Sequence, residues 1–109
     1  MSVKRVLVVE DPLVRRLIDG ILTRGGYTVV EAEPRRALTL LQQATEEIGL
    51  LVTNTPELFL DSAQQVALLY VAAFPEQQWA EKFPRCRVLP KPFPPQKLLA
   101  LAQELLKTA

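Results

Sequence analysis

The sequence predicts an α/β fold in which five short strands alternate with helices. The strand-like segments are continuously apolar and rich in β-branched residues, which is typical of parallel strands buried on both faces. Segments with helical periodicity separate them, and prolines and glycines stand at the expected boundaries. This order predicts a three-layer (βα)₅ sandwich, with a parallel sheet, right-handed crossovers and helices on both faces.

The strands and the first helix can be placed from these patterns. A helix is expected to begin at Pro12, because proline suits the first turn, with Asp11 as its N-cap. Glycines 25 and 26 end that helix. Its inward face should be formed by Leu13, Val14, Leu17, Ile18, Ile21 and Leu22. The five strands are expected at residues 6–9, 27–32, 48–53, 66–72 and 87–89.

The remaining helices follow the same logic. Pro34 opens a second helix, and the last helix should cover residues 96–106. Pro75 begins a short helix that carries Trp79 and Phe83 four residues apart. An aromatic pair at this spacing is more often core than an exposed binding stripe.

The third crossover is unusually short, since only residues 55–65 separate two strands. A parallel crossover with a helix needs at least ~10–12 residues, so the third helix should be shortened or missing. Three remedies would keep the sheet covered. Leu58, Phe59 and Leu60 could fold back as a plug, neighbouring helices could slide together, or another chain could cover the gap. We expect a homodimer or partner contact centred on Leu58–Leu60 and the Trp79 helix.

Composition excludes several classes of function. The chain has 109 residues, which suits a single domain spanning positions 1–109. The 13 basic and 12 acidic residues give no electrostatic case for nucleic acid or an anionic membrane. No apolar run is long enough to span a bilayer, and the start of the chain does not resemble a signal peptide, so a cytoplasmic location is expected. The chain lacks histidine, which excludes Ser-His-Asp and Cys-His catalysis, and Cys86 stands alone as an unreactive thiol.

Candidate site residues gather where the predicted strands end. In open α/β sheets, ligands bind at the carboxyl ends of the strands. No glycine-rich loop of the dinucleotide or Walker type is present, so a nucleotide site is poorly supported. Pro92 makes the peptide bond after Lys91 a candidate cis bond. The residues at this edge are Glu10, Asp11, Asn54, Ala72 and Lys91.

The sequence resembles the receiver domain of response regulators in two-component signalling, the CheY-like domain. Five segments in the right order carry the resemblance, and together they span nearly the whole chain: residues 6–17, 26–32, 50–54, 69–75 and 88–93. The resemblance implies a flavodoxin-like fold with strand order 2-1-3-4-5. It also implies a protein partner, such as a sensor kinase or an output domain.

The departures from the receiver pattern concern the phosphorylation chemistry. The resemblance implies that Asn54 occupies the position of the phosphoacceptor aspartate, and Ala72 that of the switch Ser or Thr. An amide is a far weaker nucleophile than a carboxylate, and alanine has no hydroxyl to bind a phosphoryl group. Lys91 is the retained lysine. We therefore expect a degenerate receiver without catalytic residues or cofactor, in which the Mg²⁺ site is lost because Asn54 carries no charge.

Several alternatives stay open on the sequence alone. Glu10 and Asp11 are either a remnant Mg²⁺ pair, or a helix cap and the counter-ions of Lys91. The first loop is one residue short, so Val9 could instead occupy an acidic position of the family. A substitute carboxylate, Glu10, Asp11 or Asp61, could still accept a phosphoryl group. A small-ligand regulatory domain on the same fold is the third alternative.

Overall fold

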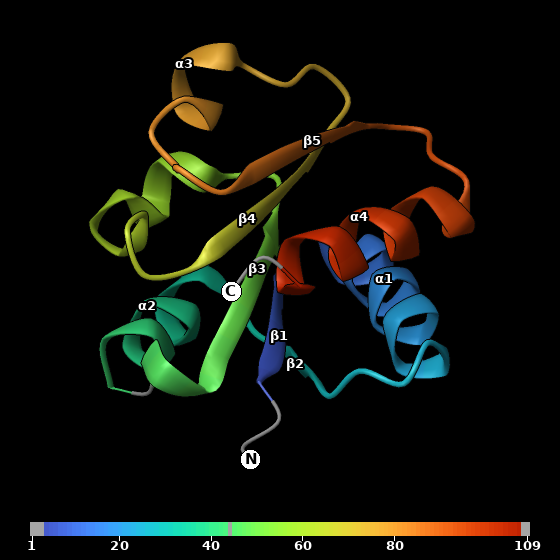
Figure 1. Cartoon of the computed structure of the whole chain (residues 1–109), viewed down its shortest axis with the longest axis horizontal. Coiled ribbons are helices and arrows are strands. Elements are labelled where there is room, and N and C mark those ends of the chain that lie inside the picture. Colours follow the sequence, from blue (N-terminus) through green and yellow to red (C-terminus); the bar gives the residue numbers. More distant parts are fainter. Residues whose placement is uncertain (1–3, 44, 108–109) are drawn as a thin grey trace.

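The computed structural model describes residues 4–43 and 45–107, and Figure 1 shows a sheet between two layers of helices. All strand pairs are parallel, and their order is β2-β1-β3-β4-β5. The predicted fold class and strand order are therefore confirmed. The strands are β1 (Arg5–Val9), β2 (Val29–Glu31), β3 (Ile48–Thr53), β4 (Ala67–Ala72) and β5 (Cys86–Pro90).

The helices divide between the two faces of the sheet as the strand order requires. In Figure 1, α1 and α4 lie together on one side, whereas α2, η2 and α3 lie on the other. A one-turn 3₁₀ helix, η1 (Thr45–Glu47), precedes β3. The other elements are α1 (Pro12–Arg24), α2 (Pro34–Gln43), the 3₁₀ segment η2 (Pro56–Ser62), α3 (Gln77–Ala80) and α4 (Pro95–Lys107).

Each face of the sheet has its own apolar core. Val8 and Val52 pack beneath α1 and α4, while Leu7 and Leu51, their neighbours in the chain, pack beneath the opposite layer. Successive side chains of a strand point to opposite faces, so a strand buried on both must be apolar throughout. This alternation explains the unbroken apolar runs of the sequence.

The first helix begins and ends at the predicted residues. Gly26 follows its last turn with φ +95°, a left-handed conformation that glycine adopts without strain. Asp11 stands at the N-cap, but its side chain forms no capping hydrogen bond. The prediction is therefore right about the position of Asp11 and wrong about its capping role.

The third crossover contains no α-helix, as predicted, and η2 takes its place. Non-helical backbone angles at Phe59 (φ −123°, ψ 24°) divide η2 into two short turns. The Phe59 side chain is only 1% exposed and belongs to the same buried cluster as Leu51 and Leu68. Of the three expected remedies, the structure therefore has the first, in which Phe59 folds back against the sheet. The expectation that Phe59 contacts a partner is wrong, because its ring is part of the domain's own core. Leu58 is 47% exposed.

Replacing this plug is expected to destabilise the domain strongly. Phe59→Ala should lower the free energy of unfolding by about 3–5 kcal/mol, as is typical for a buried phenylalanine, because it leaves a cavity against β3 and β4. Leu58→Ala is the matched control and should change stability by no more than about 0.5 kcal/mol. Urea denaturation of the three proteins measures both values. Equal effects of the two substitutions would show that Phe59 does not fill the core.

Candidate functional site

The carboxyl ends of β1, β3, β4 and β5 meet at one edge of the sheet. Glu10 follows β1, Asn54 follows β3, Ala72 ends β4 and Lys91 follows β5. The backbone N–H of Lys91 donates to the carbonyl of Ala72 at 2.9 Å, which holds the end of β5 against β4. The peptide bond between Lys91 and Pro92 is cis, as predicted.

An ion pair between Glu10 and Lys91 dominates this edge. Lys91 Nζ lies 2.9 Å from Glu10 Oε2, and the Glu10 side chain is completely buried. The contact is an ion pair and not a well-aligned hydrogen bond, since Oε2 has no partner of suitable angle in the described part of the chain. The other carboxylate oxygen, Oε1, accepts the backbone N–H of Asp11 at 3.0 Å. Both oxygens of Glu10 are therefore engaged inside the domain.

The two neighbouring acids lie in different environments. Asp11 is exposed at the start of α1, whereas Glu10 is buried. Among the ion pairs of the described residues, Lys91 is paired with Glu10 and not with Asp11. Glu10 thus acts as the counter-ion of Lys91. Asp61 is exposed near the end of η2, on the way to the amino end of β4, and so belongs to another region.

Asn54 and Ala72 complete the edge with uncharged groups. Both are partly buried. The turn after β3 is shaped by its threonines, since the Thr55 N–H donates to Thr53 Oγ1 at 3.1 Å. Asn54 offers an amide where a carboxylate would be needed for nucleophilic attack, and the methyl group of Ala72 donates no hydrogen bond. The ends of β3 and β4 therefore supply neither a nucleophilic carboxylate at position 54 nor a hydroxyl at position 72.

At this edge Mg²⁺ would have to compete with Lys91 for the buried carboxylate. Mg²⁺ prefers oxygen ligands that include one or two carboxylates. Glu10 already neutralises Lys91 at 2.9 Å, so a cation would have to displace an ammonium group from a buried carboxylate. In residues 4–43 and 45–107, no three His, Cys, Asp or Glu side chains gather closely enough to hold a metal ion.

Some contacts around the site were not predicted from the sequence. Arg15 Nε donates to Glu31 Oε1 at 3.1 Å and ties α1 to the end of β2. The Tyr70 hydroxyl accepts the backbone N–H of Glu76 at 3.0 Å, and Trp79 Nε1 donates to Glu76 Oε2 at 2.9 Å. These bonds fix the loop between β4 and α3 near the site. The Arg15–Glu31 contact depends on how α1 packs beside β2, whereas the two contacts of Glu76 are local to the loop after β4.

Sequence reasoning also missed a group of apolar residues beside Lys91. Val14 and Leu17 of α1 and Phe93 border the same open cleft as the lysine side chain. The only signal was the helical periodicity of α1, which assigned Val14 and Leu17 to the inward face. Leu17 is in fact 54% exposed.

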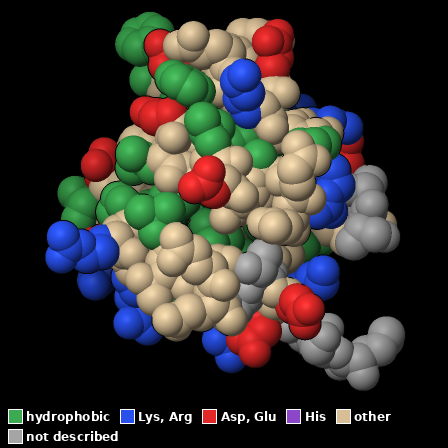
Figure 2. All heavy atoms as spheres, turned by 90° about the vertical axis from the view of Figure 1, so that its left-hand side faces the viewer, with side chains coloured by type: hydrophobic (Ala, Val, Ile, Leu, Met, Phe, Trp, Pro, Cys, Tyr) green, Lys and Arg blue, Asp and Glu red, His purple; other side chains and the backbone are tan. Residues whose placement is uncertain are grey.

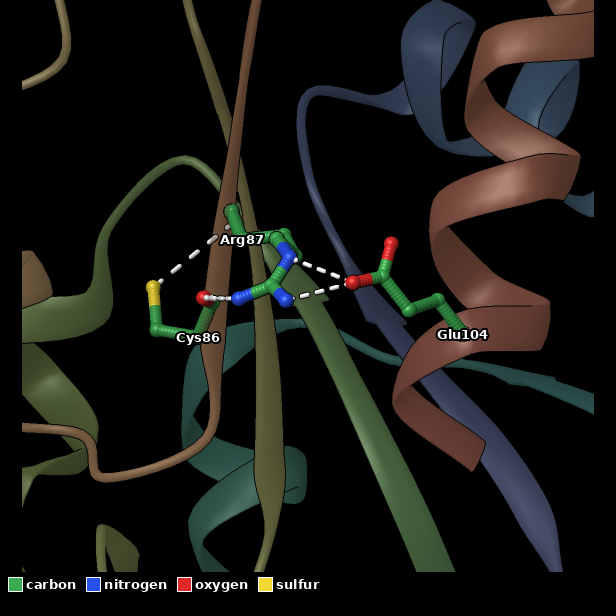
Figure 3. Close-up of polar contacts among 3 residues, drawn as sticks. All are labelled: Cys86, Arg87 and Glu104. Carbon is green, nitrogen blue, oxygen red and sulfur yellow. Dashed lines mark hydrogen bonds and ion pairs between the residues drawn. The ribbon is translucent and has the colours of Figure 1, made fainter. Parts of the chain in front are cut away.

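Cys86 lies away from this edge, and its thiol is unreactive. Figure 3 shows Arg87 of β5 between the Cys86 carbonyl, which accepts from Nη1 at 3.1 Å, and Glu104 of α4. Arg87 Nε and Nη2 both donate to the same oxygen of Glu104. Burial raises the pKa of the Cys86 thiol to about 11, although the charge of Arg87 opposes the shift. The thiol therefore stays protonated near neutral pH and is a poor nucleophile, as expected.

No family model matches the chain, and no curated protein matches it either. Solved structures do resemble it in fold. The chain resembles the chemotaxis response regulator CheY4 of Vibrio cholerae with a TM-score of 0.80 and 23% identity, over 96% of this chain and 100% of that one. It resembles the receiver domain of the hybrid histidine kinase CckA with a TM-score of 0.76 and 24% identity, over 94% and 98% of the two chains.

A third likeness is to one part of a larger protein. The chain matches NtrX from Brucella abortus with a TM-score of 0.80 and 20% identity, over 99% of this chain and 27% of that one. At such identities the likenesses establish the fold alone. The chain has the fold of CheY-like receiver domains, as the sequence resemblance implied. Within the described residues, no helix is long and apolar enough to cross a membrane.

Removing one partner of the buried ion pair is expected to lower the stability of the domain strongly, whereas removing both charges together is expected to lower it much less. Lys91→Met leaves the Glu10 carboxylate buried without a counter-ion, which should lower the free energy of unfolding by about 3–5 kcal/mol. Adding Glu10→Gln to Lys91→Met should recover most of that loss. A double-mutant cycle in urea measures the coupling, and additive effects would contradict the pairing.

Mg²⁺ is expected not to bind at millimolar concentration. The buried carboxylate is neutralised by Lys91, and Asn54 contributes no charge. Amide chemical shifts of Glu10 and Asp11, followed during a MgCl₂ titration at constant ionic strength, test this. A saturable shift at these residues that CaCl₂ and NaCl do not reproduce would contradict the prediction.

Proposed function

We propose that this chain is a degenerate receiver domain that acts in signal transduction through protein–protein contacts, without phosphorylation of an aspartate and without enzymatic activity. The observation that carries the proposal is the ion pair between Glu10 and Lys91, at 2.9 Å, on the edge where Asn54 and Ala72 also lie. The fold is that of signalling receivers, whereas at this edge the Lys91 ammonium is already paired with a buried carboxylate.

Three features of the edge argue against phosphoryl transfer. The amide of Asn54 is a weak nucleophile, and Ala72 has no hydroxyl to hold a transferred group. Lys91 matches the lysine that, in receivers, contacts the phosphoryl oxygens. Here its ammonium is already neutralised by a completely buried carboxylate. A phosphoryl group would therefore have to compete with Glu10 for the Lys91 ammonium, and it would meet an amide at position 54.

The partner would be a sensor kinase or an output domain, met in the cytoplasm. The likenesses to a receiver domain of a hybrid kinase and to one part of NtrX support such a partner. We place the contact on the α2–η2–α3 face, meaning the surface around Leu38, Leu58, Leu60 and Trp79. Leu38 and Leu58 are 37% and 47% exposed, and Leu60 and Trp79 are partly buried. Figure 2 views the molecule from this side and shows hydrophobic side chains gathered over the middle of the face.

Acetyl phosphate with Mg²⁺ is expected not to phosphorylate the protein. Intact-mass measurement should show no gain of one phosphoryl group, because Asn54 is an amide and Ala72 has no hydroxyl. Asn54→Asp should be phosphorylated weakly at most, since Ala72 and the pairing of Lys91 with Glu10 are unchanged. A receiver domain with an intact aspartate serves as the positive control.

A substitute carboxylate is the outcome that would overturn this proposal. A base-labile phosphoryl adduct on the wild-type chain, lost after substitution of Glu10, Asp11 or Asp61, would identify a receiver that still accepts phosphate. Mapping the adduct by peptide mass would separate the buried Glu10 from the exposed Asp11 and Asp61.

Substitution of Leu58 is expected to disrupt self-association if the contact joins two copies. Wild-type protein should sediment faster as its concentration rises, and Leu58→Glu should remain a monomer, because a charge at an exposed leucine prevents burial of the face. Leu13→Glu, an exposed leucine on the opposite helical layer, is the control and should still associate. A wild type that is monomeric at every concentration would contradict the homodimer.

A further inference from the structure

An open cleft of about 430 Å³ lies between α1 and the loops that follow β4 and β5. Small-molecule sites commonly measure roughly 300–1,000 Å³ and are mostly apolar, with a few polar groups that orient the ligand. This cleft has that composition, with a single charged side chain among apolar ones. Its lining residues are Val14, Leu17, Ala73, Lys91, Pro92 and Phe93.

Large apolar side chains are exposed around this cleft. Leu17, which lines it, is 54% exposed, and Leu13 one turn earlier on α1 is 87% exposed. Phe74, directly after the lining residue Ala73, is 90% exposed. Single exposed leucines are ordinary, but an exposed leucine in the wall of an apolar cleft, with further exposed apolar residues next to its lining in the chain, is typical of a binding site.

Lys91 gives the cleft one polar anchor. Its ammonium has three N–H donors, and the ion pair with Glu10 Oε2 occupies only one side of the group. The side chain is 24% exposed and lines the cleft, so a donor can still reach a ligand there. Because Glu10 balances the charge of Lys91, the cleft favours one acceptor group and not a multiply charged anion such as a phosphate.

We propose that this cleft binds a small amphipathic molecule, with an aromatic or branched aliphatic body against Val14, Leu17 and Phe93 and one carboxylate or carbonyl oxygen at Lys91. This proposal goes beyond the proposed signalling function, because it requires no protein partner and no phosphorylation. A ligand here would contact α1 and both loops at the carboxyl edge of the sheet, on the other side of the molecule from the α2–η2–α3 face.

The test uses 3-phenylpropionate as the probe on the full chain, with amide spectra recorded during the titration. We expect saturable shifts at Val14, Leu17, Ala73, Lys91 and Phe93. Acetate, which has the acceptor without the apolar body, should produce no saturable shift. Ala73→Leu fills the cleft and should weaken binding by at least about tenfold. Ala100→Leu, the same change at an exposed position of α4, is the matched control and should bind like the wild type.

Two further variants keep the proposal falsifiable if Ala73→Leu disturbs the fold. Leu17→Gln changes an exposed residue that lines the cleft and should also weaken the binding of the probe. Glu10→Gln combined with Lys91→Met removes both charges together with the N–H donors of Lys91, and should weaken the binding of 3-phenylpropionate. Absence of saturable shifts, or equal affinity in wild type and Leu17→Gln, would overturn the proposal. Neither result bears on the acetyl phosphate experiment, which tests the signalling function separately.

Discussion

The need to cover both faces of a parallel sheet governs the whole structure. Strands β1, β3 and β4 are buried along almost their entire length, so helices must pack on either side of them. The short third crossover cannot supply a full helix for this purpose. Phe59 fills the gap from η2 and joins the core beneath α2 and α3. One aromatic ring thereby covers the part of that face which a longer helix would otherwise cover.

The same cores explain why the fold depends little on the residues at the carboxyl ends of its strands. The apolar side chains that hold the sheet lie inside its two faces, while Asn54 and Ala72 lie at its edge. Substitutions at the edge therefore remove little apolar packing. Glu10 is the exception, because a completely buried carboxylate needs a counter-ion, and Lys91 provides it across the sheet.

Much of the fold could be predicted because its signals are local. The strand at 48–53 coincides with the observed β3, since a continuous apolar run ends abruptly at Asn54. The second strand begins two residues later than predicted, because pairing with β1 starts only at Val29. Phe83 was expected on the short helix but lies beyond its end, although its ring is buried as predicted for a core residue.

The site was harder to predict because it depends on distance across the sheet. Positions at the ends of predicted strands place five residues at one edge: Glu10, Asp11, Asn54, Ala72 and Lys91. They do not predict that Lys91 pairs with Glu10 and not with Asp11. Likewise, periodicity placed Leu13 and Leu17 on the inward side of α1, although neither the sheet nor α4 covers them. Spacing along a helix defines a face, whereas burial depends on whether a neighbouring element reaches it. For this reason the apolar cleft beside Lys91, which arises where that cover ends, became visible only in three dimensions.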